Sequence, residues 1–552
     1  MVMLCARLTT AQSGWHEVRS PNFIIYTNVG ERSARRVASD LERIRQVLQV
    51  ALPTARNSDH LPLGVIAVKQ QRDLRRLLPG FDRDVGGLFR SGANGPQVAF
   101  VAGSGSRYQN FGLGTLYHEF FHYLVALNGP GIPSWLNEGL ASFWDQTEIR
   151  DDRIIVGQPD QLYVRTLREG HRFPMEEMLR GPRRALNSRL TYLLYAQRWA
   201  LAHYLMLGEG GAHQEKLMNY IALVRAGGDV VEAAETAFGD FEPLKEIFNV
   251  YGRQKKLFDY ITIPLDPNGD DAELRVRTLP DADTYAIRAR FIVDGSRPEE
   301  AEPLIQNALK RVPQQAIALE AQAIVDLRRD DRESARSWIQ RAIATGQASP
   351  SAYLLHANVL PGPEGREEAL LRAIMMDRGL ASAYEALAFH YAEVDPSYGR
   401  ALAMTREAAE RDPSSAQRRL LVARALRKMG SFDESVKEAG HAVRLALGSH
   451  TWESNNVCWF GSLGGLAAEV MPACEAAVSL YPDATSYLDT RGLARALTGD
   501  TSGAIADFQG FVDAGGKDEE ALAERRRWIE ALQQGRDPFD DEALAELLGK
   551  PF

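Results

Sequence analysis

The chain has 552 residues, of which 45% are hydrophobic and 25% are charged, a composition typical of soluble globular proteins with two or more domains. Its formal net charge of −9 argues against a nucleic-acid-binding protein, which would need a basic face. No apolar run approaches the about 18 residues that a membrane-spanning helix requires.

The first fourteen residues admit two interpretations. Met1–Ala6 is apolar but too short for the hydrophobic region of a signal peptide, and no basic segment precedes it. Thr9-Thr-Ala11 followed by Gln12 is compatible with the end of a cleavage site. Residues 1–14 are therefore either a tail or the remnant of a signal peptide.

Three segments that follow have the composition of strands, with β-branched and aromatic residues bounded by turn residues. They are 22–28, 63–68 and 97–102. Residues 31–52 carry apolar side chains at helical spacing, and a second helix is predicted through Leu74 and Leu77. The pattern predicts a small sheet that opens an α+β domain over residues 15–257.

The stretch Thr115-Leu-Tyr-His-Glu-Phe-Phe-His-Tyr-Leu-Val125 carries the first candidate for chemistry. On a helix, His118 and His122 lie on one face about one turn apart, where two imidazoles can bind one Zn²⁺. Glu119 lies between them and can reach a water at the metal. Apolar neighbours on both sides predict that this helix is largely buried, where polar side chains need partners.

A second stretch, Trp135-Leu-Asn-Glu-Gly-Leu-Ala-Ser-Phe143, follows a loop rich in Gly and Pro. The spacing allows the first helix to end and a second helix to bring Glu138 back to the metal. Two histidines and one glutamate leave a fourth zinc position open, which is typical of catalytic rather than structural sites.

Together the two stretches resemble the gluzincin zinc peptidases, most closely the peptidase MA-like family that often carries tetratricopeptide repeats, over residues 14–255. The resemblance implies that His118, His122 and Glu138 bind one Zn²⁺ per chain and that Glu119 is the general base. Tyr195, in Tyr195-Ala-Gln-Arg-Trp-Ala-Leu-Ala-His-Tyr-Leu205, would stabilise the oxyanion of the transition state. Proteins of this family are often exported, which favours the periplasm over the cytoplasm.

The resemblance also implies a substrate-binding strand. In gluzincins the strand before the zinc helix is an edge strand that pairs with the substrate backbone, so Ala99, Phe100, Val101 and Ala102 would bind substrate by strand addition, unless this is an ordinary strand of the sheet. The spacer between His122 and Glu138 is shorter than in the aminopeptidase relatives, and their Gly-x-Met-x-Asn segment is absent. Aminopeptidase specificity is therefore not predicted.

The remainder of this domain is predicted to begin with a short hairpin over 148–156 and to continue as helices over 161–256. The helices are broken at Gly170, Gly181-Pro182, Gly208–Gly211 and Gly227-Gly228. His203 is expected to be a packed or surface residue without a chemical role. Asn137 and Ser142 are candidates for orienting the metal-binding histidines.

Residues 258–282 are predicted to form a connecting hairpin, and 283–552 an all-α solenoid. Ala301, Ala308 and Pro313 repeat the spacing of Ala401, Ala408 and Pro413, and Gly430 and Gly499 lie two repeats apart. This texture resembles tetratricopeptide repeats, in roughly seven helical hairpins with a terminal cap over about 518–549. Residues 351–379 fit the repeat least well.

Cys458 and Cys474 fall on the first and second helices of one pair, at similar heights. They form either a disulfide, which would imply export, or two buried thiols that pack as small apolar residues. Cys5 has no cysteine near it in sequence, and no zinc site of cysteines is predicted.

Two hypotheses for function follow. In the first, a zinc peptidase hydrolyses peptide bonds with a metal-activated water, and the repeats bind its substrate or a protein partner. In the second, the protein is a non-catalytic repeat scaffold whose zinc lobe is structural or inactive. Hydrolysis of a bond other than a peptide bond is a weaker alternative.

Overall fold

The computed structural model describes residues 14–51, 62–80, 86–92, 95–102, 109–127, 132–169, 171–181, 186–225, 228–253, 259–265, 273–447, 451–480, 484–515 and 518–548. By the contacts among its residues, the chain divides into two compact units of three segments each. Unit 1 consists of Met1–Leu124, Trp144–Val156 and Ile261–Ala386. Unit 2 consists of Val125–Phe143, Gly157–Tyr260 and Leu387–Phe552.

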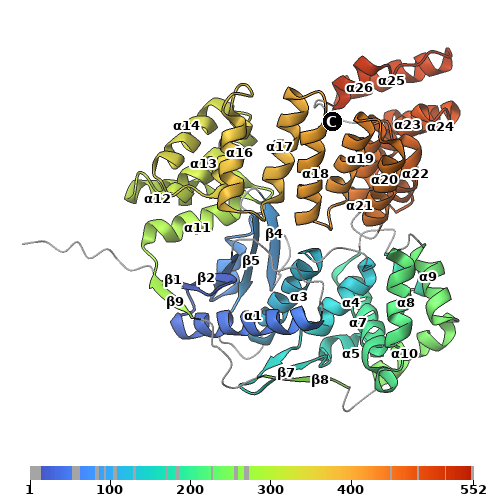
Figure 1. Cartoon of the computed structure of the whole chain (residues 1–552). Coiled ribbons are helices and arrows are strands. Elements are labelled where there is room, and N and C mark those ends of the chain that lie inside the picture. The colour runs from blue at the N-terminus through green and yellow to red at the C-terminus, as the bar shows by residue number, and fades with distance from the viewer. Residues whose placement is uncertain are drawn as a thin grey trace, which may run out of the picture. The chain divides into compact units, whose positions relative to one another are not determined.

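Unit 1 contains a six-stranded mixed sheet with the strand order β4-β5-β3-β2-β1-β9 (Figure 1). Its strands are β1 (His16–Arg19), β2 (Phe23–Thr27), β3 (Leu63–Val68), β4 (Gly87–Gly92), β5 (Gly95–Val101) and β9 (Arg275–Thr278). β3 is parallel to both β2 and β5, and the other neighbours are antiparallel. The predicted strands β2, β3 and β5 are confirmed. The pattern does not predict β1, which is short and polar, or β4, which is bounded by glycines.

Helices cover both faces of this sheet. α1 (Glu31–Ala51) contacts β1 and β2, and α3 (Gln109–Leu127) brings Phe120 to 5.3 Å from Phe23 of β2, measured between ring centroids. On the other face, Ile66 and Val101 pack against α2 (Gln71–Arg75) and against Phe291 of α11 (Asp281–Val293). Burial on both sides explains why β3 and β5 are almost continuously apolar instead of alternating.

The segment predicted as a connecting hairpin forms two strands that do not pair with each other. β8 (Ile261–Pro264) joins β7 (Arg153–Val156) and β6 (Glu148–Ile149) in a three-stranded sheet. β9 instead pairs with β1 at the edge of the six-stranded sheet. The predicted strands and the hairpin over 148–156 are confirmed, but the connecting hairpin is wrong, because each strand completes a different sheet.

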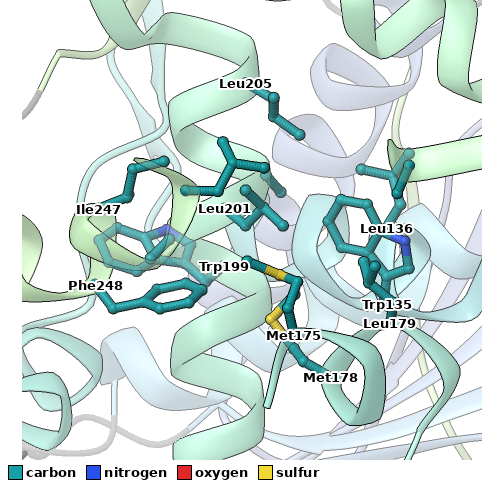
Figure 2. Close-up of a cluster of buried hydrophobic side chains, with 14 of the residues drawn as sticks. Trp135, Leu136, Met175, Met178, Leu179, Trp199, Leu201, Leu205, Ile247 and Phe248 are labelled. Carbon is teal, nitrogen blue, oxygen red and sulfur yellow. The ribbon is translucent and has the colours of Figure 1, made fainter. Parts of the chain in front are cut away.

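Unit 2 contains a helical lobe built around one apolar core, part of which is shown in Figure 2. Its helices are α4 (Ser134–Trp144), α5 (Gln161–Arg168), α6 (Met175–Arg180), α7 (Ser188–Gly211), α8 (Gln214–Arg225), α9 (Val230–Phe238) and α10 (Phe241–Arg253). Trp135 of α4, Met178 of α6, Trp199 of α7 and Phe248 of α10 are buried in this core. The predicted breaks at Gly181 and Gly208–Gly211 are confirmed, since α6 ends at the former and α7 loses helical dihedral angles in the latter. Those at Gly170, Pro182 and Gly227 lie outside the described residues.

The predicted helical repeats begin in unit 1. Three antiparallel pairs are α11 with α12 (Glu302–Arg311), α13 (Ala316–Arg328) with α14 (Arg332–Ala344), and α15 (Pro350–Val359) with α16 (Arg366–Met376). A single 3₁₀ turn, η1 (Pro298–Ala301), precedes α12. Ala301 and Ala308 are fully buried, as small residues at a close contact between helices must be. The segment 351–379, which fits the repeat least well, still forms the pair α15 and α16.

The repeats continue through α17 (Ala381–Val394) into unit 2. There they comprise α18 (Gly399–Arg411), α19 (Ala416–Lys428) with α20 (Phe432–Leu447), α21 (Thr451–Leu463) with α22 (Ala467–Leu480), and α23 (Thr485–Leu497) with α24 (Thr501–Ala514). Gly430 and Gly499 adopt positive φ values of 78° and 85° in the turns that follow α19 and α23. The predicted cap is formed by α25 (Glu519–Gln533) and α26 (Asp541–Leu548).

Cys458 of α21 and Cys474 of α22 are joined by a disulfide, so the first of the two alternatives holds for this pair. Among the described residues, no helix combines the length and apolar character needed to cross a membrane.

Candidate metal centre

α3 carries the His118-Glu119-x-x-His122 motif, as predicted. The helix has large apolar residues around most of its circumference, and Leu116, Phe120 and Phe121 are buried, so its polar residues lie in a largely apolar setting. The Nε2 atoms of His118 and His122 are 3.1 Å apart. The two imidazoles therefore converge through the same ring nitrogen on a common point.

An aspartate not predicted from the sequence fixes one of these rings. Asp145 follows directly after α4, and its Oδ1 lies 3.0 Å from Nδ1 of His118. The two side chains are only 15% and 14% exposed. A carboxylate at this distance holds the proton on Nδ1 and leaves Nε2 as the lone-pair donor, which is the tautomer that a metal ligand needs.

Glu138 on α4 completes the predicted ligand set. One side-chain ligand atom each from His118, His122 and Glu138 all lie within 4.8 Å of one another. Ligands at ~2.0–2.1 Å from a tetrahedral zinc ion are ~3.4 Å apart, so the trio can close on such an ion with small side-chain movements. Two imidazoles and one carboxylate are also the donors of catalytic zinc sites. The residues present thus fit zinc.

Two glycines account for the close packing around α4. A Cβ at Gly139 would lie 2.6 Å from the carbonyl oxygen of Arg198, so α4 approaches the backbone of α7 where the sequence has no side chain. A Cβ at Gly114 of α3 would lie 2.6 Å from the carbonyl oxygen of Asp145. Trp135, fully buried, donates a hydrogen bond of 2.7 Å from Nε1 to the hydroxyl of Tyr220. These contacts fix the helix that presents Glu138.

Arg198 is a second residue at this site that the sequence analysis does not identify. It is only 7% exposed, and its guanidinium donates through Nε and Nη2 to the carbonyl oxygen of Met178 at 3.4 Å. Burial lowers the pKa of Arg198, while the charges of Glu138 and Tyr195 act in the opposite direction. Arg198 thus places a buried positive charge in the electrostatic environment of a predicted metal ligand.

Tyr195 lies on α7, three residues before Arg198, and packs partly buried against the core of the helical lobe. Both Tyr195 and Glu138 contribute to the electrostatic field at Arg198. Tyr195 and the predicted ligand Glu138 therefore both lie near Arg198. The predicted role of Tyr195 as oxyanion donor stays a prediction.

The predicted substrate-binding strand does not lie at an edge. β5 is paired on one side with β3 and on the other with β4, and Ala99, Phe100 and Val101 are buried in the sheet. The amide of Ala102 also donates to the carbonyl of Val68. The prediction that residues 99–102 pair with a substrate backbone is therefore wrong, because their own backbone groups are already used in the sheet.

The edge on that side is β4, which lies next to the metal helix. Ring centroids of Phe89 on β4 and Tyr123 on α3 are 6.0 Å apart, and a Cβ at Gly87 would lie 3.1 Å from Cγ2 of Thr115. β4 was missed because its sequence, Gly-Leu-Phe-Arg-Ser-Gly, is too short to show alternation beside two glycines. A peptide that extended this sheet would do so along β4.

Three further polar residues of the helical lobe were considered from the sequence, and the structure shows which of them are hydrogen-bonded. The side-chain oxygens of Asn137 and Ser142 are buried without a hydrogen-bond partner among the described residues, so neither orients a histidine as predicted. His203 is buried, with Nδ1 2.9 Å from the hydroxyl of Tyr251 and Nε2 3.0 Å from the carbonyl of Gly157. His203 is therefore a packed residue with both ring nitrogens in use.

Comparison with solved structures finds a likeness to tetratricopeptide repeat proteins among others. No protein-family model and no curated protein matches the chain. A tetratricopeptide repeat protein from Parabacteroides merdae is 15% identical, with 46% of this chain and 99% of that one covered and a TM-score of 0.34. The C-terminal part of a TPR repeat-containing protein from Cytophaga hutchinsonii is 9% identical, with 43% and 98% covered and a TM-score of 0.30. Yeast Tom70 is 14% identical, with 64% and 84% covered and a TM-score of 0.30. Scores this low carry no conclusion about function.

Proposed function

We propose that the protein is a zinc-dependent peptidase, with zinc held by His118, His122 and Glu138. The observation that carries the proposal is the convergence of these three side chains, whose ligand atoms lie within 4.8 Å of one another. Glu119 adjoins the first ligand on the same helix. A donor set of two histidines and one glutamate is that of catalytic zinc, with a coordination position left for water or substrate.

When bound, zinc would supply a Lewis acid that activates a water and stabilises negative charge on the substrate oxygen. In the proposed reaction Glu119 accepts a proton from the attacking water and passes it to the leaving amine. Asp145 is a positioning residue, since its hydrogen bond to Nδ1 fixes the ring of His118. Tyr195 is the proposed donor to the developing oxyanion.

The repeat array would bind the protein substrate or a protein partner. Stacked helical hairpins offer an extended surface for a peptide or a protein partner. We assign this binding role to the repeat array. We assign the chemical role to the residues of α3 and α4.

A non-catalytic repeat scaffold is the second candidate. Helical hairpins run from α11 (Asp281–Val293) to α24 (Thr501–Ala514), about two fifths of the chain. In that case the zinc lobe would be structural or inactive. The length of the repeat array favours this candidate, and the convergence of His118, His122 and Glu138 favours the peptidase.

Metal content and proteolysis, measured on the same preparations of the whole chain, distinguish the two. The variants are Glu119→Gln, which keeps the ligands, and the double variant His118→Ala/His122→Ala, which removes two of them. Glu215→Gln is the matched control, because Glu215 is an exposed glutamate of the helical lobe. Zinc is quantified by elemental mass spectrometry, and cleavage is followed by mass spectrometry on a pool of unstructured peptides.

A peptidase predicts one zinc per chain in the wild type, Glu119→Gln and Glu215→Gln, and none in the double variant. Cleavage should persist only in the wild type and Glu215→Gln. Full activity of Glu119→Gln would refute the proposed role of the glutamate. If the wild type stays free of zinc after zinc is added and cleaves no peptide, the peptidase is refuted and the non-catalytic repeat scaffold is supported.

A further inference from the structure

Arg198 of α7 is a buried cation whose direct contacts leave its charge unbalanced. Both Nε and Nη2 of its guanidinium donate to a single acceptor, the carbonyl oxygen of Met178, over 3.4 Å. A neutral carbonyl at this distance is a weak partner for a group that carries five donors and a full charge. Arg198 takes part in no ion pair among the described residues, so a balancing charge has to act on it from further away.

Helix α4 meets α7 at this arginine. A Cβ at Gly139 of α4 would lie 2.6 Å from the carbonyl oxygen of Arg198 and 2.8 Å from Cβ of Ala202. Arg198 and Ala202 are one turn apart and share the face of α7 that touches α4, and Tyr195 lies on the same side, three residues before Arg198. Glu138 directly precedes Gly139, so the backbone of this predicted ligand lies within one residue of the contact.

Glu138 is the acidic group whose charge acts on the buried guanidinium. Burial lowers the pKa of Arg198, and the charge of Glu138 is the largest influence in the opposite direction, followed by that of Tyr195. Opposite charges that do not touch attract each other strongly only where water is largely excluded. The neighbours of Arg198 on α7 meet this condition, since Trp199 and Ala200 are fully buried.

Packing alone does not explain an arginine at this position. A buried cation costs stability, and an apolar side chain of similar volume would fill the same space at least as well. The hydrogen bonds to Met178 are long and end on one neutral oxygen, so they offset little of that cost. What an apolar side chain cannot do is attract a carboxylate on the neighbouring helix.

We propose that Arg198 is a positioning residue of the metal centre, whose buried positive charge attracts the carboxylate of Glu138 and holds it where the two histidines can share a metal ion with it. The inference rests on the proposed metal centre. Groups outside the ligand shell orient a ligand before the metal arrives, and their loss weakens metal binding without removing a ligand. Asp145 does this for His118, and Arg198 does it for the ligand that α4 supplies.

The first test is a double-mutant cycle on the whole chain without metal. The free energy of unfolding in urea is measured at pH 7, with a chelator present, for the wild type, Arg198→Met, Glu138→Gln and the double variant. Each single change leaves one charge without its counterpart, whereas the double variant leaves neither. We therefore expect the double variant to be more stable than the sum of the two single effects predicts.

Additive effects in this cycle would overturn the proposal. If Arg198→Met alone does not fold, the cycle still decides. Recovery of folding when Glu138→Gln is added supports the attraction between the two charges, and a double variant that stays unfolded contradicts it.

The second test measures zinc affinity by competition with a chelator. Arg198→Met should bind zinc about tenfold more weakly than the wild type, and Arg198→Lys, which keeps the charge, should stay within about threefold. Arg189→Met is the matched control, because Arg189 is an exposed arginine near the start of α7, and its zinc affinity should equal that of the wild type. An equal loss in Arg198→Met and Arg198→Lys would show that the side chain acts through its shape and would refute the role of its charge.

The two tests separate this inference from the proposed metal centre. The cycle is run without metal, so it reports only the attraction between Arg198 and Glu138. A wild type that binds zinc but gives an additive cycle keeps the metal centre and refutes the role of Arg198. A wild type that binds no zinc but gives a non-additive cycle refutes the metal centre and supports the attraction.

Discussion

The burial of Asp40 on α1, near the helix α3, can be tested quantitatively through the pH dependence of stability. Its side chain is buried, and that burial raises the pKa of Asp40 from 3.8 to about 6, against the opposing effect of Arg36 and Arg43. Its charge in turn helps to raise the pKa of Tyr117, which is buried on α3 next to His118. Asp40 is thus an acidic group under the metal helix that folding prefers to keep protonated.

The magnitude follows from linkage. A folded pKa of about 6 against 3.8 in the unfolded chain is a difference of about 2 units, or about 3 kcal/mol at about 1.36 kcal/mol per unit. Between these two pKa values the folded state binds more protons than the unfolded state, so this group's contribution to stability falls as the pH rises. Above about pH 7 the full cost is present. Asp40→Asn should therefore be more stable than the wild type by about 3 kcal/mol there, since the folded pKa already includes the effect of Arg36 and Arg43.

The measurement is the free energy of unfolding in urea, followed by circular dichroism, for wild type and Asp40→Asn between pH 4 and pH 7.5. The difference between the two proteins should be small near pH 4 and grow through pH 6. Asp152→Asn, at an exposed aspartate of the hairpin between β6 and β7, should show no such growth. A difference that is constant with pH, or an asparagine variant less stable at neutral pH, would refute the assignment of a buried, strained carboxylate.

Two further predictions concern the metal centre and the repeats. Asp145→Ala should weaken zinc binding by about 10- to 100-fold, measured by competition with a chelator, because His118 loses the partner that fixes its tautomer, and an unchanged affinity would contradict the role of Asp145. The paired change Cys458→Ala/Cys474→Ala should lower the free energy of unfolding by about 3 kcal/mol, as expected for closing a loop of this length, with the residues 16 apart in sequence. A reductant should then destabilise the wild type but not the variant, and free thiols in the native wild type would contradict the second prediction.

Features that depend on neighbours in sequence were predictable. α1 follows from the spacing of apolar side chains, α3 and α4 from the two motifs they carry, and the repeats from small residues and glycines at a regular period. The convergence of His118, His122 and Glu138 follows as well, because a helix fixes the first two and a short connection limits where the third can lie. Each of these predictions depends only on residues that are close together in the sequence.

Features that depend on the order of strands were not predictable in this way. Whether β5 is an edge strand is decided by β4, which pairs with it although the short sequence of β4 shows no alternation. The strands β8 and β9 look like a hairpin in sequence, but each satisfies the backbone of a distant strand, β7 and β1. Asp145 did leave a signal, since it is an acidic residue seven positions after Glu138, directly after the end of α4. Asn137 and Ser142 are nearer to Glu138 in sequence, but their buried side-chain oxygens have no hydrogen-bond partner among the described residues.

Two buried arginines in unit 2 differ in their surroundings. The comparison shows how the neighbouring groups, rather than the residue type, decide whether a buried charge is balanced. Arg198 is buried beside carbonyl and carboxylate groups, with Met178 accepting from its guanidinium and Glu138 balancing its charge. Arg424 is buried to a similar degree, yet Nε and Nη2 find no acceptor among the described residues. A folded chain that only needed to fill that space would be more stable with an apolar side chain. Arg424 therefore lowers the stability of the repeat array, and Arg424→Met should raise the melting temperature of the protein.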